Sequence, residues 1–387
     1  MPTVFIPKEV VPGETRVAAT PETVKRMVKT GFKVIVESGA GAGSYISDDA
    51  FREAGADVSA DTGASWGAAD VVLKLHPPRF NEAAKAFEAD MFKEGAVGVS
   101  FLYPYQNLDT VKQLAKKKVT AFAMDLIPRI TRAQSMDALS SQANIAGYKA
   151  VLMAAEALPR IFPLLMTAAG TIKPAKVVIM GAGVAGLQAI ATAKRLGAIV
   201  EVSDIRPAVK EQVQSLGAKF IEIEGAENME TEGGYAKEVS AEFLKKQQDL
   251  VRQHMAEADV VITTALVPGK KAPILVTAET VKAMRDGSVI VDLATEQGGN
   301  CELSEPGKTV VKEGVTIIGT QNIPGTVAFH ASDVYAKNIL YVINHLFPKG
   351  EAKLDLEDEI NKGAILTHAG EIRDPQVAAK AQENGGS

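Results

Sequence analysis

The chain has 387 residues, 46% of them hydrophobic and 23% charged, a composition typical of a folded globular protein with two or three domains. It has 42 Lys and Arg against 47 Asp and Glu, and the net charge of -5 removes the electrostatic reason to expect a nucleic-acid or anionic-membrane binder. The single cysteine, Cys301, excludes an internal disulfide. The five scattered histidines lack zinc-ligand spacing, so no metal site is predicted and a reducing, cytoplasmic setting is expected.

Neither end of the chain predicts a membrane segment. The N-terminus has no basic region followed by a long apolar run, so a secretory signal is not expected. No segment approaches the roughly 20 apolar residues that span a bilayer, and no direct membrane insertion is predicted. Residues 379–387 are small, polar and glycine-rich, which predicts a disordered tail.

In the N-terminal third of the chain, short β-branched runs alternate with helical stretches, a pattern that predicts an α/β protein with mostly parallel sheets. The predicted strands are residues 3–6, 33–37, 71–75, 97–101 and 120–124. A first helix begins at Pro21, with Thr20 as its cap, and ends at Gly31. Residues 135–158, rich in Ala, Leu and Met, predict a long connecting helix.

A second alternating series predicts a second, separate sheet. Its strands are residues 176–180, 199–203, 219–223, 259–264, 288–293 and 316–319. A helix over 328–346 then returns to the first domain. We therefore expect two Rossmann-like domains joined by long helices, the first of residues 1–138 plus 328–378 and the second of residues 139–327.

A glycine-rich turn is the strongest local signal. G-x-G-x-x-G at Gly181, Gly183 and Gly186 directly follows the apolar strand 176–180 and opens a helical stretch that ends at Gly197. The first glycine permits a tight turn, the second lets the backbone approach a pyrophosphate, and the third lets helix and strand pack. This context predicts a dinucleotide site and disfavours the alternative of a glycine-rich turn without a ligand.

The end of the next strand predicts which dinucleotide binds. Asp204 follows residues 199–203, where a carboxylate can accept hydrogen bonds from the adenosine ribose. A 2′-phosphate would meet a like charge there, so Asp204 predicts NAD rather than NADP. Arg206, two residues further on, is the one feature that favours NADP.

Two polar stretches remain ambiguous when read from the residues alone. Residues 128–137 are most typical of a loop followed by a helix start, with Ser135 as the cap. Residues 224–238 are acidic, contain Gly233 and Gly234, and are most typical of a solvated loop.

The whole chain resembles the soluble NAD(H)-binding component of proton-translocating NAD(P) transhydrogenases. The resemblance rests on colinear motifs: IPKE at 6–9, PGETRVA at 12–18, residues 128–137, MTAAGT at 166–171, the glycine-rich turn, GGYAKE at 233–238, TTALVPGK at 263–270 and GGNC at 298–301. It implies hydride transfer between NAD(H) on this chain and NADP(H) held only on a partner component. It also implies a membrane-spanning partner that couples transfer to proton translocation, a homodimer, and a peripheral position on the inner face of the cytoplasmic membrane through the partners.

The resemblance also implies roles for particular residues. The catalytic set beside the nicotinamide is Arg129, Gln134, Asp137 and Ser140, with Gln134 facing the partner's nucleotide. Residues 224–238 would form a lid over the nucleotide. The cofactor-binding set is Gly181, Ala182, Gly183, Val184, Gly186, Asp204, Ile205, Arg206, Gly234, Tyr235, Thr264, Ala265 and Leu266.

The chain also resembles the alanine dehydrogenases. This resemblance gives an alternative function, that of an NAD-dependent amino-acid dehydrogenase. Arg16 and Lys74 match the groups with which that family binds its keto acid. Its catalytic histidine would fall within residues 101–106, which contain none, and Glu296 stands in place of its aspartate. Amine oxidation moves a proton with the hydride, whereas transfer between nicotinamides moves none, so this loss favours transhydrogenation. A second alternative is a non-catalytic NAD-binding regulatory protein.

Overall fold

The computed structural model describes residues 1–222, 241–266 and 270–383. These residues form two compact units, Met1–Gln142 with Pro324–Ser387 (unit 1) and Ala143–Ile323 (unit 2). The division lies four residues from each expected boundary. The side chain of Gln142 accepts a hydrogen bond from Arg16 and donates one to the carbonyl of Ala331, contacts that hold the first turn of the connecting helix in unit 1.

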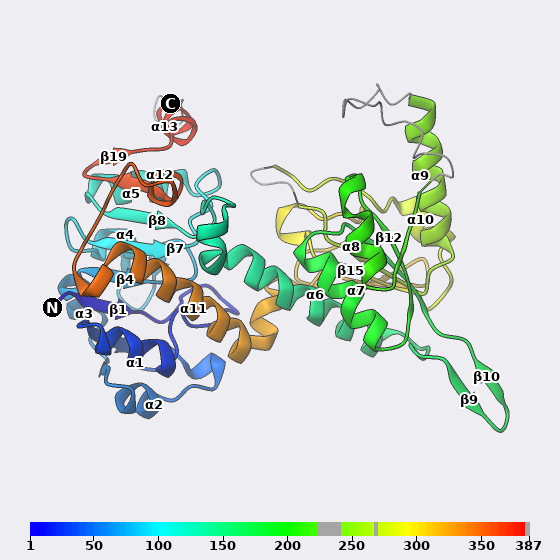
Figure 1. The fold of residues 1–387 in the computed structure, drawn as a ribbon, viewed down its shortest axis with the longest axis horizontal. Helices are drawn as coiled ribbons and strands as arrows, with labels where there is room; N and C mark the ends of the chain where they lie inside the picture. Colours follow the sequence, from blue (N-terminus) through cyan, green and yellow to red (C-terminus); the bar gives the residue numbers. More distant parts are fainter. Residues whose placement is uncertain (223–240, 267–269, 384–387) are drawn as a thin grey trace. The chain divides into compact units, whose positions relative to one another are not determined.

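Unit 1 is built on an eight-stranded sheet in the order β19-β18-β8-β7-β4-β1-β2-β3 (Figure 1). Its strands are β1 (Thr3–Ile6), β2 (Lys33–Glu37), β3 (Asp57–Ser59), β4 (Val71–Leu73), β7 (Val97–Ser100), β8 (Thr120–Ala123), β18 (Ile365–His368) and β19 (Glu371–Ile372). The first six run parallel, and β18 pairs antiparallel with both β8 and β19. A small antiparallel pair, β5 (Phe80–Asn81) and β6 (Ala86–Phe87), lies outside this sheet.

Both faces of the unit 1 sheet are buried, and successive apolar residues of a strand point alternately into the two cores. Along β1, Val4 and Ile6 belong to one core and Phe5 to the other, as expected for successive side chains of a strand. Helix α11, far along the chain, lies beside α1 on the first face (Figure 1). The helices of unit 1 are α1 (Pro21–Lys29), α2 (Asp48–Glu53), α3 (Thr62–Ala68), α4 (Glu88–Met91), α5 (Leu108–Lys116), α11 (Ala328–Leu346), α12 (Glu359–Ala364) and α13 (Pro375–Glu383), with 3₁₀ turns η1 (Ala42–Ser44), η2 (Thr131–Met136) and η7 (Pro348–Gly350).

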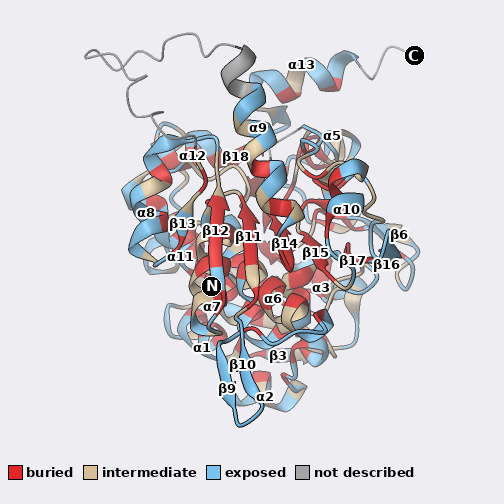
Figure 2. Cartoon of the chain, turned by 90° about the vertical axis from the view of Figure 1, so that its right-hand side faces the viewer, coloured by how far each residue is buried: buried red, intermediate tan, exposed pale blue. Residues whose placement is uncertain are grey.

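Unit 2 has a seven-stranded sheet in the order β13-β12-β11-β14-β15-β17-β16, parallel except for its last strand. Its strands are β11 (Lys176–Met180), β12 (Ile199–Ser203), β13 (Lys219–Phe220), β14 (Val260–Thr263), β15 (Val289–Asp292), β16 (Thr309–Lys312) and β17 (Val315–Ile318). The six parallel strands, all except β16, form the doubly wound order. The direction of this order reverses between β11 and β14, where dinucleotides bind in this fold. Figure 2 shows these central strands as buried.

Helices cover both faces of this sheet as well. The helices of unit 2 are the greater part of α6 (Ala138–Ala157), α7 (Val184–Arg195), α8 (Lys210–Ser215), α9 (Ala241–Ala256) and α10 (Ala278–Ala283). Its 3₁₀ turns are η3 (Pro207–Val209), η5 (Thr295–Gln297) and η6 (Ile323–Val327), and η6 continues into unit 1. Helices α6, α7 and α8 pack on the face of Val177 and Ile179, and α9 and α10 on the face of Val178.

The predicted α/β class with two mostly parallel sheets is confirmed. Strands β1, β2, β11 and β12 and helix α11 have the predicted bounds. The connecting helix starts at Ala138 rather than 135, because Asp137, not Ser135, accepts a hydrogen bond from the Ser140 N–H. Between the connecting helix and β11, where no strand was predicted, the chain forms a hairpin, β9 (Leu165–Thr167) and β10 (Gly170–Ile172), exposed along its length (Figure 2).

The prediction of a disordered tail from residue 379 is wrong for residues 379–383. They complete α13, whose first turn is capped by Asp374 through the N–H groups of Gln376 and Val377. Val377 is fully buried and Ala381, four residues later, is nearly so. Small residues in this segment therefore serve close packing of a short helix rather than chain flexibility.

Gly147 tests the packing of α6 against α7. A Cβ placed on Gly147 would lie 2.1 Å from the carbonyl oxygen of Ala185, a backbone atom that side-chain rotation cannot move. We expect Gly147→Ala to lower the free energy of unfolding by about 2 kcal/mol or more. Gly67→Ala is the control, because a Cβ there meets nothing within 4 Å. Urea unfolding curves that show the same midpoint for both variants would contradict this account.

Candidate functional site

Three glycines shape the turn between β11 and α7, each for a different reason. Gly181 has φ +108°, a conformation that side chains disfavour. A Cβ on Gly186 would lie 1.9 Å from the carbonyl oxygen of Gly181, so only glycine fits there. A Cβ on Gly183 would meet nothing within 4 Å, and the open space in front of this residue at the N-terminus of α7 suits a phosphate.

Asp204 follows β12 and is held against this turn. Its carboxylate accepts a hydrogen bond from the Ala182 N–H at 2.7 Å and is 6% exposed. Arg206 donates to the same carboxylate from its backbone N–H, Nε and Nη2 at 2.8–2.9 Å. Burial alone would raise the pKa of Asp204, but these hydrogen bonds outweigh it and hold the pKa below its usual range.

The loop after β14 forms the other wall of this candidate site. Thr264 donates from Oγ1 to the carbonyls of Met180 and Gly181, both at 3.2 Å, and so ties the loop to the glycine-rich turn. Val184, Ile205 and Leu266 are exposed at 40%, 98% and 48%. Apolar side chains exposed around a polar turn suit the flat rings of a dinucleotide.

Sequence reasoning missed two residues that position this loop. The Asn300 side chain accepts from the Ala265 N–H and donates to the Ala265 carbonyl, at 3.0 and 2.9 Å. Asp292, at the end of β15, accepts from the N–H groups of Asn300 and Cys301 and from the hydroxyls of Thr263 and Ser304. Both are fully buried. The GGNC motif at 298–301 was the only signal, and a motif does not reveal which backbone groups a side chain contacts.

The predicted catalytic residues lie together in unit 1, in and around η2 and the first turn of α6. Asp137 accepts hydrogen bonds from the N–H and Oγ of Ser140 at 2.9 and 2.6 Å. Arg129 and Gln134 are exposed, and among the described residues neither side chain has a hydrogen-bond partner. Gly234 and Tyr235 of the predicted lid lie outside the described residues.

Unit 1 also contains a buried Arg16, with its charge already neutralised. Glu14 accepts from Nε and Nη2 of Arg16 at 2.8 and 2.7 Å, and Gln142 accepts from Nη1. His76 Nε2 lies 2.6 Å from the same Glu14 carboxylate. Burial opposes ionisation of Glu14, yet the contacts with Arg16 and His76 hold its pKa far below the usual range. The carboxylate position on this arginine is therefore filled by the protein.

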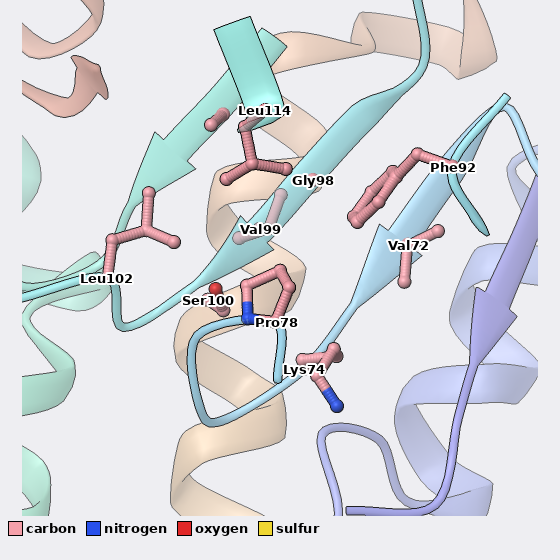
Figure 3. Close-up of a pocket in the computed structure, with 10 residues that line it drawn as sticks. Val72, Lys74, Pro78, Phe92, Gly98, Val99, Ser100, Leu102 and Leu114 are labelled. Atoms are coloured by element: carbon pink, nitrogen blue, oxygen red, sulfur yellow. The ribbon is translucent and has the colours of Figure 1, made fainter. Parts of the chain in front are cut away.

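Lys74 is neutralised in the same way. Its ammonium lies 3.3 Å from Glu9 and 3.2 Å from Glu88, and all three side chains are at most 3% exposed. Burial opposes the charge, but the two carboxylates keep the lysine pKa raised. Figure 3 shows the ammonium directed away from Phe92 and Leu114. The cavity on the side of Phe92 and Leu114 measures about 10 Å³, enough for one water at most.

Other residues stand where the catalytic groups of an alanine dehydrogenase would fall. Phe101 stacks on Tyr103 at 5.6 Å between ring centroids and contacts the ring of Tyr335 at 5.3 Å. Glu296 accepts a hydrogen bond from the Asn322 N–H at 2.6 Å. In the described part of the chain, no group of three or more His, Cys, Asp or Glu could hold a metal ion. No helix in the residues described is both long and apolar enough to cross a membrane.

The chain belongs to the alanine dehydrogenase/PNT family: the model of the family's N-terminal domain matches residues 5–146 and that of its C-terminal domain matches residues 150–375. Within this family it is 51% identical over 381 residues to the first of the separate parts of the NAD(P) transhydrogenase alpha subunit of Rhodospirillum rubrum, a match that covers 97% of this chain and 99% of the relative. Alanine dehydrogenase 2 of Staphylococcus aureus is 31% identical over 330 residues, covering 83% of this chain and 81% of that protein.

A solved structure agrees with this placement. The crystal structure of transhydrogenase from Sinorhizobium meliloti is 48% identical, with a TM-score of 0.86, and the match covers 96% of this chain and 99% of that one. The higher identity over nearly the full length groups this chain with the transhydrogenase subunits rather than with the alanine dehydrogenases.

Substitution of Gly183 should change NADH affinity, whereas substitution of Gly186 should change thermal stability. We expect Gly183→Ala to leave the melting temperature unchanged, since its Cβ enters open space, and to weaken NADH binding about tenfold or more, since that space is needed by the pyrophosphate. Gly186→Ala should lower the melting temperature, because its Cβ overlaps the Gly181 carbonyl. Thermal unfolding and fluorescence titration with NADH measure the two effects. Unchanged NADH affinity in Gly183→Ala would show that this turn does not hold the cofactor.

Proposed function

We propose that this chain is the NAD(H)-binding component of a proton-translocating NAD(P) transhydrogenase and transfers hydride between its own NAD(H) and NADP(H) held by a partner component. The observation that carries the proposal is the 51% identity, over nearly the whole of both chains, to one part of a transhydrogenase alpha subunit. The neutralised Arg16 and Lys74 support it, because they leave no charged pair to receive a keto acid. The amino-acid dehydrogenase alternative is thereby disfavoured.

Unit 2 would bind the dinucleotide. The backbone N–H groups at the start of α7 face the pyrophosphate, and Gly183 leaves it room. Asp204 would accept hydrogen bonds from the adenosine ribose. Ala265, held by Asn300, would contact the dinucleotide together with Val184, Ile205 and Leu266. The cofactor supplies the hydride at its nicotinamide, and the chain binds, orients and excludes water. No proton leaves or enters a substrate, so an acid/base residue is not required.

The segment that carries Arg129, Gln134, Asp137 and Ser140 would place the nicotinamide. Asp137 and Ser140 hold each other through two hydrogen bonds and fix the start of α6. The Arg129 and Gln134 side chains are free to contact ligands, and Gln134 would face the nucleotide of the partner. Hydride transfer between two rings depends on their separation and alignment, so positioning is the main contribution of these residues.

Partners complete the proposal. The Rhodospirillum rubrum relative is by its name only one part of a divided alpha subunit. We propose that this chain likewise assembles with an NADP(H)-binding component and a membrane-spanning component, which hold it at the inner face of the cytoplasmic membrane. We also propose a homodimer. The β9–β10 hairpin exposes Leu165, Met166 and Ile172 at 41%, 78% and 40%, and exposed apolar residues on a projecting hairpin suit a subunit contact.

Asp204 should set the preference for NADH over NADPH. In the parent protein NADH should bind well and NADPH poorly, because a 2′-phosphate meets the carboxylate charge. Asp204→Ala should weaken NADH binding and narrow the difference between the two nucleotides. Titration of both at one salt concentration checks this, with Asp204→Asn as the variant of the same shape that removes the charge and replaces one acceptor oxygen by an amide donor. Equal dissociation constants in the parent protein would be incompatible with the assignment.

Variants of Gln134 and Arg129 should distinguish an effect on hydride transfer from an effect on NADH binding. Gln134→Asn should leave NADH affinity near the parental value and slow single-turnover hydride transfer to the NADP-binding partner, by up to about a hundredfold, because it affects only the geometry of the assembled rings. Arg129→Ala should reduce both affinity and transfer. If Gln134→Asn transfers hydride at the parental rate, or if its defect disappears at saturating NADH, Gln134 does not face the partner's nucleotide.

A further inference from the structure

The carboxylate of Asp204 has no acceptor position left for a ligand. A carboxylate offers about four lone-pair sites on its two oxygens. Oδ1 accepts from the backbone N–H and Nε of Arg206, at 2.8 and 2.9 Å. Oδ2 accepts from the Ala182 N–H at 2.7 Å and from Nη2 of Arg206 at 2.9 Å. Two ribose hydroxyls can therefore bind here only if two of these donors leave.

Only one of the three donor groups can leave without a movement of the backbone. The Ala182 N–H belongs to the glycine-rich turn, and Ala182 is 2% exposed. The N–H of Arg206 belongs to the backbone two residues beyond Asp204 and cannot move without the loop. The guanidinium of Arg206 is attached to a flexible side chain that is 56% exposed, so it can leave the carboxylate and enter water by side-chain rotation alone. Release of the guanidinium frees one acceptor position on each oxygen of Asp204.

We propose that Arg206 is an internal competitor for the ribose site and thereby sets how strictly the chain discriminates between NADH and NADPH. The inference rests on the proposed function. With the guanidinium bound, Asp204 is neutralised and occupied, which weakens binding of a nucleotide with a free ribose diol. When displaced, the guanidinium stays within reach of the ribose edge, where its charge attracts a 2′-phosphate. Arg206 therefore acts against NADH and in favour of NADPH.

This role makes opposite predictions for the two nucleotides. Arg206→Met keeps the length of the side chain and removes its charge and donors. NADH should bind at least about threefold more tightly to this variant, because the guanidinium no longer competes for the carboxylate, and NADPH should bind more weakly than to the parent protein. Arg206→Lys, with its charge retained on a single donor group, should keep NADPH affinity near the parental value.

The experiment is fluorescence titration of the full chain with NADH and with NADPH at one low salt concentration. Arg285→Gln is the matched control, because Arg285 is 54% exposed in the same unit and pairs only distantly with Asp259, at 3.7 Å. This control removes the same charge, so it measures any general loss of attraction to anionic nucleotides. The inference is supported when Arg206→Met, corrected for Arg285→Gln, strengthens NADH and weakens NADPH.

Two outcomes would overturn the inference. A parallel loss of affinity for both nucleotides would mean that Arg206 contacts a group that they share, such as the adenine ring, and unchanged affinities would mean that the guanidinium neither competes nor attracts. In both cases the parent protein still binds NADH and the proposed function stands. Failure of the parent protein to bind NADH would overturn the proposed function and this inference with it.

Discussion

One close backbone contact organises the candidate nucleotide site. The Cα of Gly186 approaches the carbonyl of Gly181 so closely that a Cβ would lie 1.9 Å from the oxygen, and this contact sets α7 against the end of β11. The turn then directs the first N–H groups of α7 to the carboxyl edge of the sheet. Asp204 can accept from the Ala182 N–H, and Thr264 can reach the Gly181 carbonyl, only because the turn is this tight. The three loops of the site thus depend on two glycines.

In unit 1, the corresponding end of the sheet holds buried ion pairs rather than a glycine-rich turn. Its Rossmann-like strand order reverses between β1 and β4, and the segments after those two strands bring Glu9, Glu14 and Lys74 into the fold. The buried Arg16 and Lys74 have internal counter-charges at 2.7–3.3 Å, Glu14 for Arg16, and Glu9 and Glu88 for Lys74. Replacing one partner would leave a buried, unpaired charge, which costs about 3–5 kcal/mol. These residues therefore serve the stability of unit 1 and need no ligand to explain their presence.

The sequence predicted most of the sheet and some of the site, and the difference has a physical reason. Central strands such as β11 and β12 are short, mostly apolar runs bounded by turns, so their limits can be read directly. Strand β18 and helix α13 could not, because they are short, and their positions follow from packing against β8 and α5. The glycine motif and Asp204 were recognisable from local spacing. Asn300 and Asp292 were not, because their roles consist of hydrogen bonds to groups up to 35 residues away.

The distribution of fixed and free groups fits transfer between two bound nucleotides. Apart from the Arg206 guanidinium, the groups around the glycine-rich turn are held by hydrogen bonds to the backbone, and this order reduces the entropy lost when the cofactor binds. Among the described residues of the proposed catalytic segment, Asp137 and Ser140 hold each other, whereas the side chains of Arg129 and Gln134 have no hydrogen-bond partner. An exposed amide without a partner contributes nothing to the stability of an isolated chain. The segment is held on both sides of Gln134, by the contact of Arg132 with Asp358 and by the hydrogen bond from Asn338 to the Ser135 carbonyl. This arrangement supports the proposal that Gln134 acts only when a second surface is present.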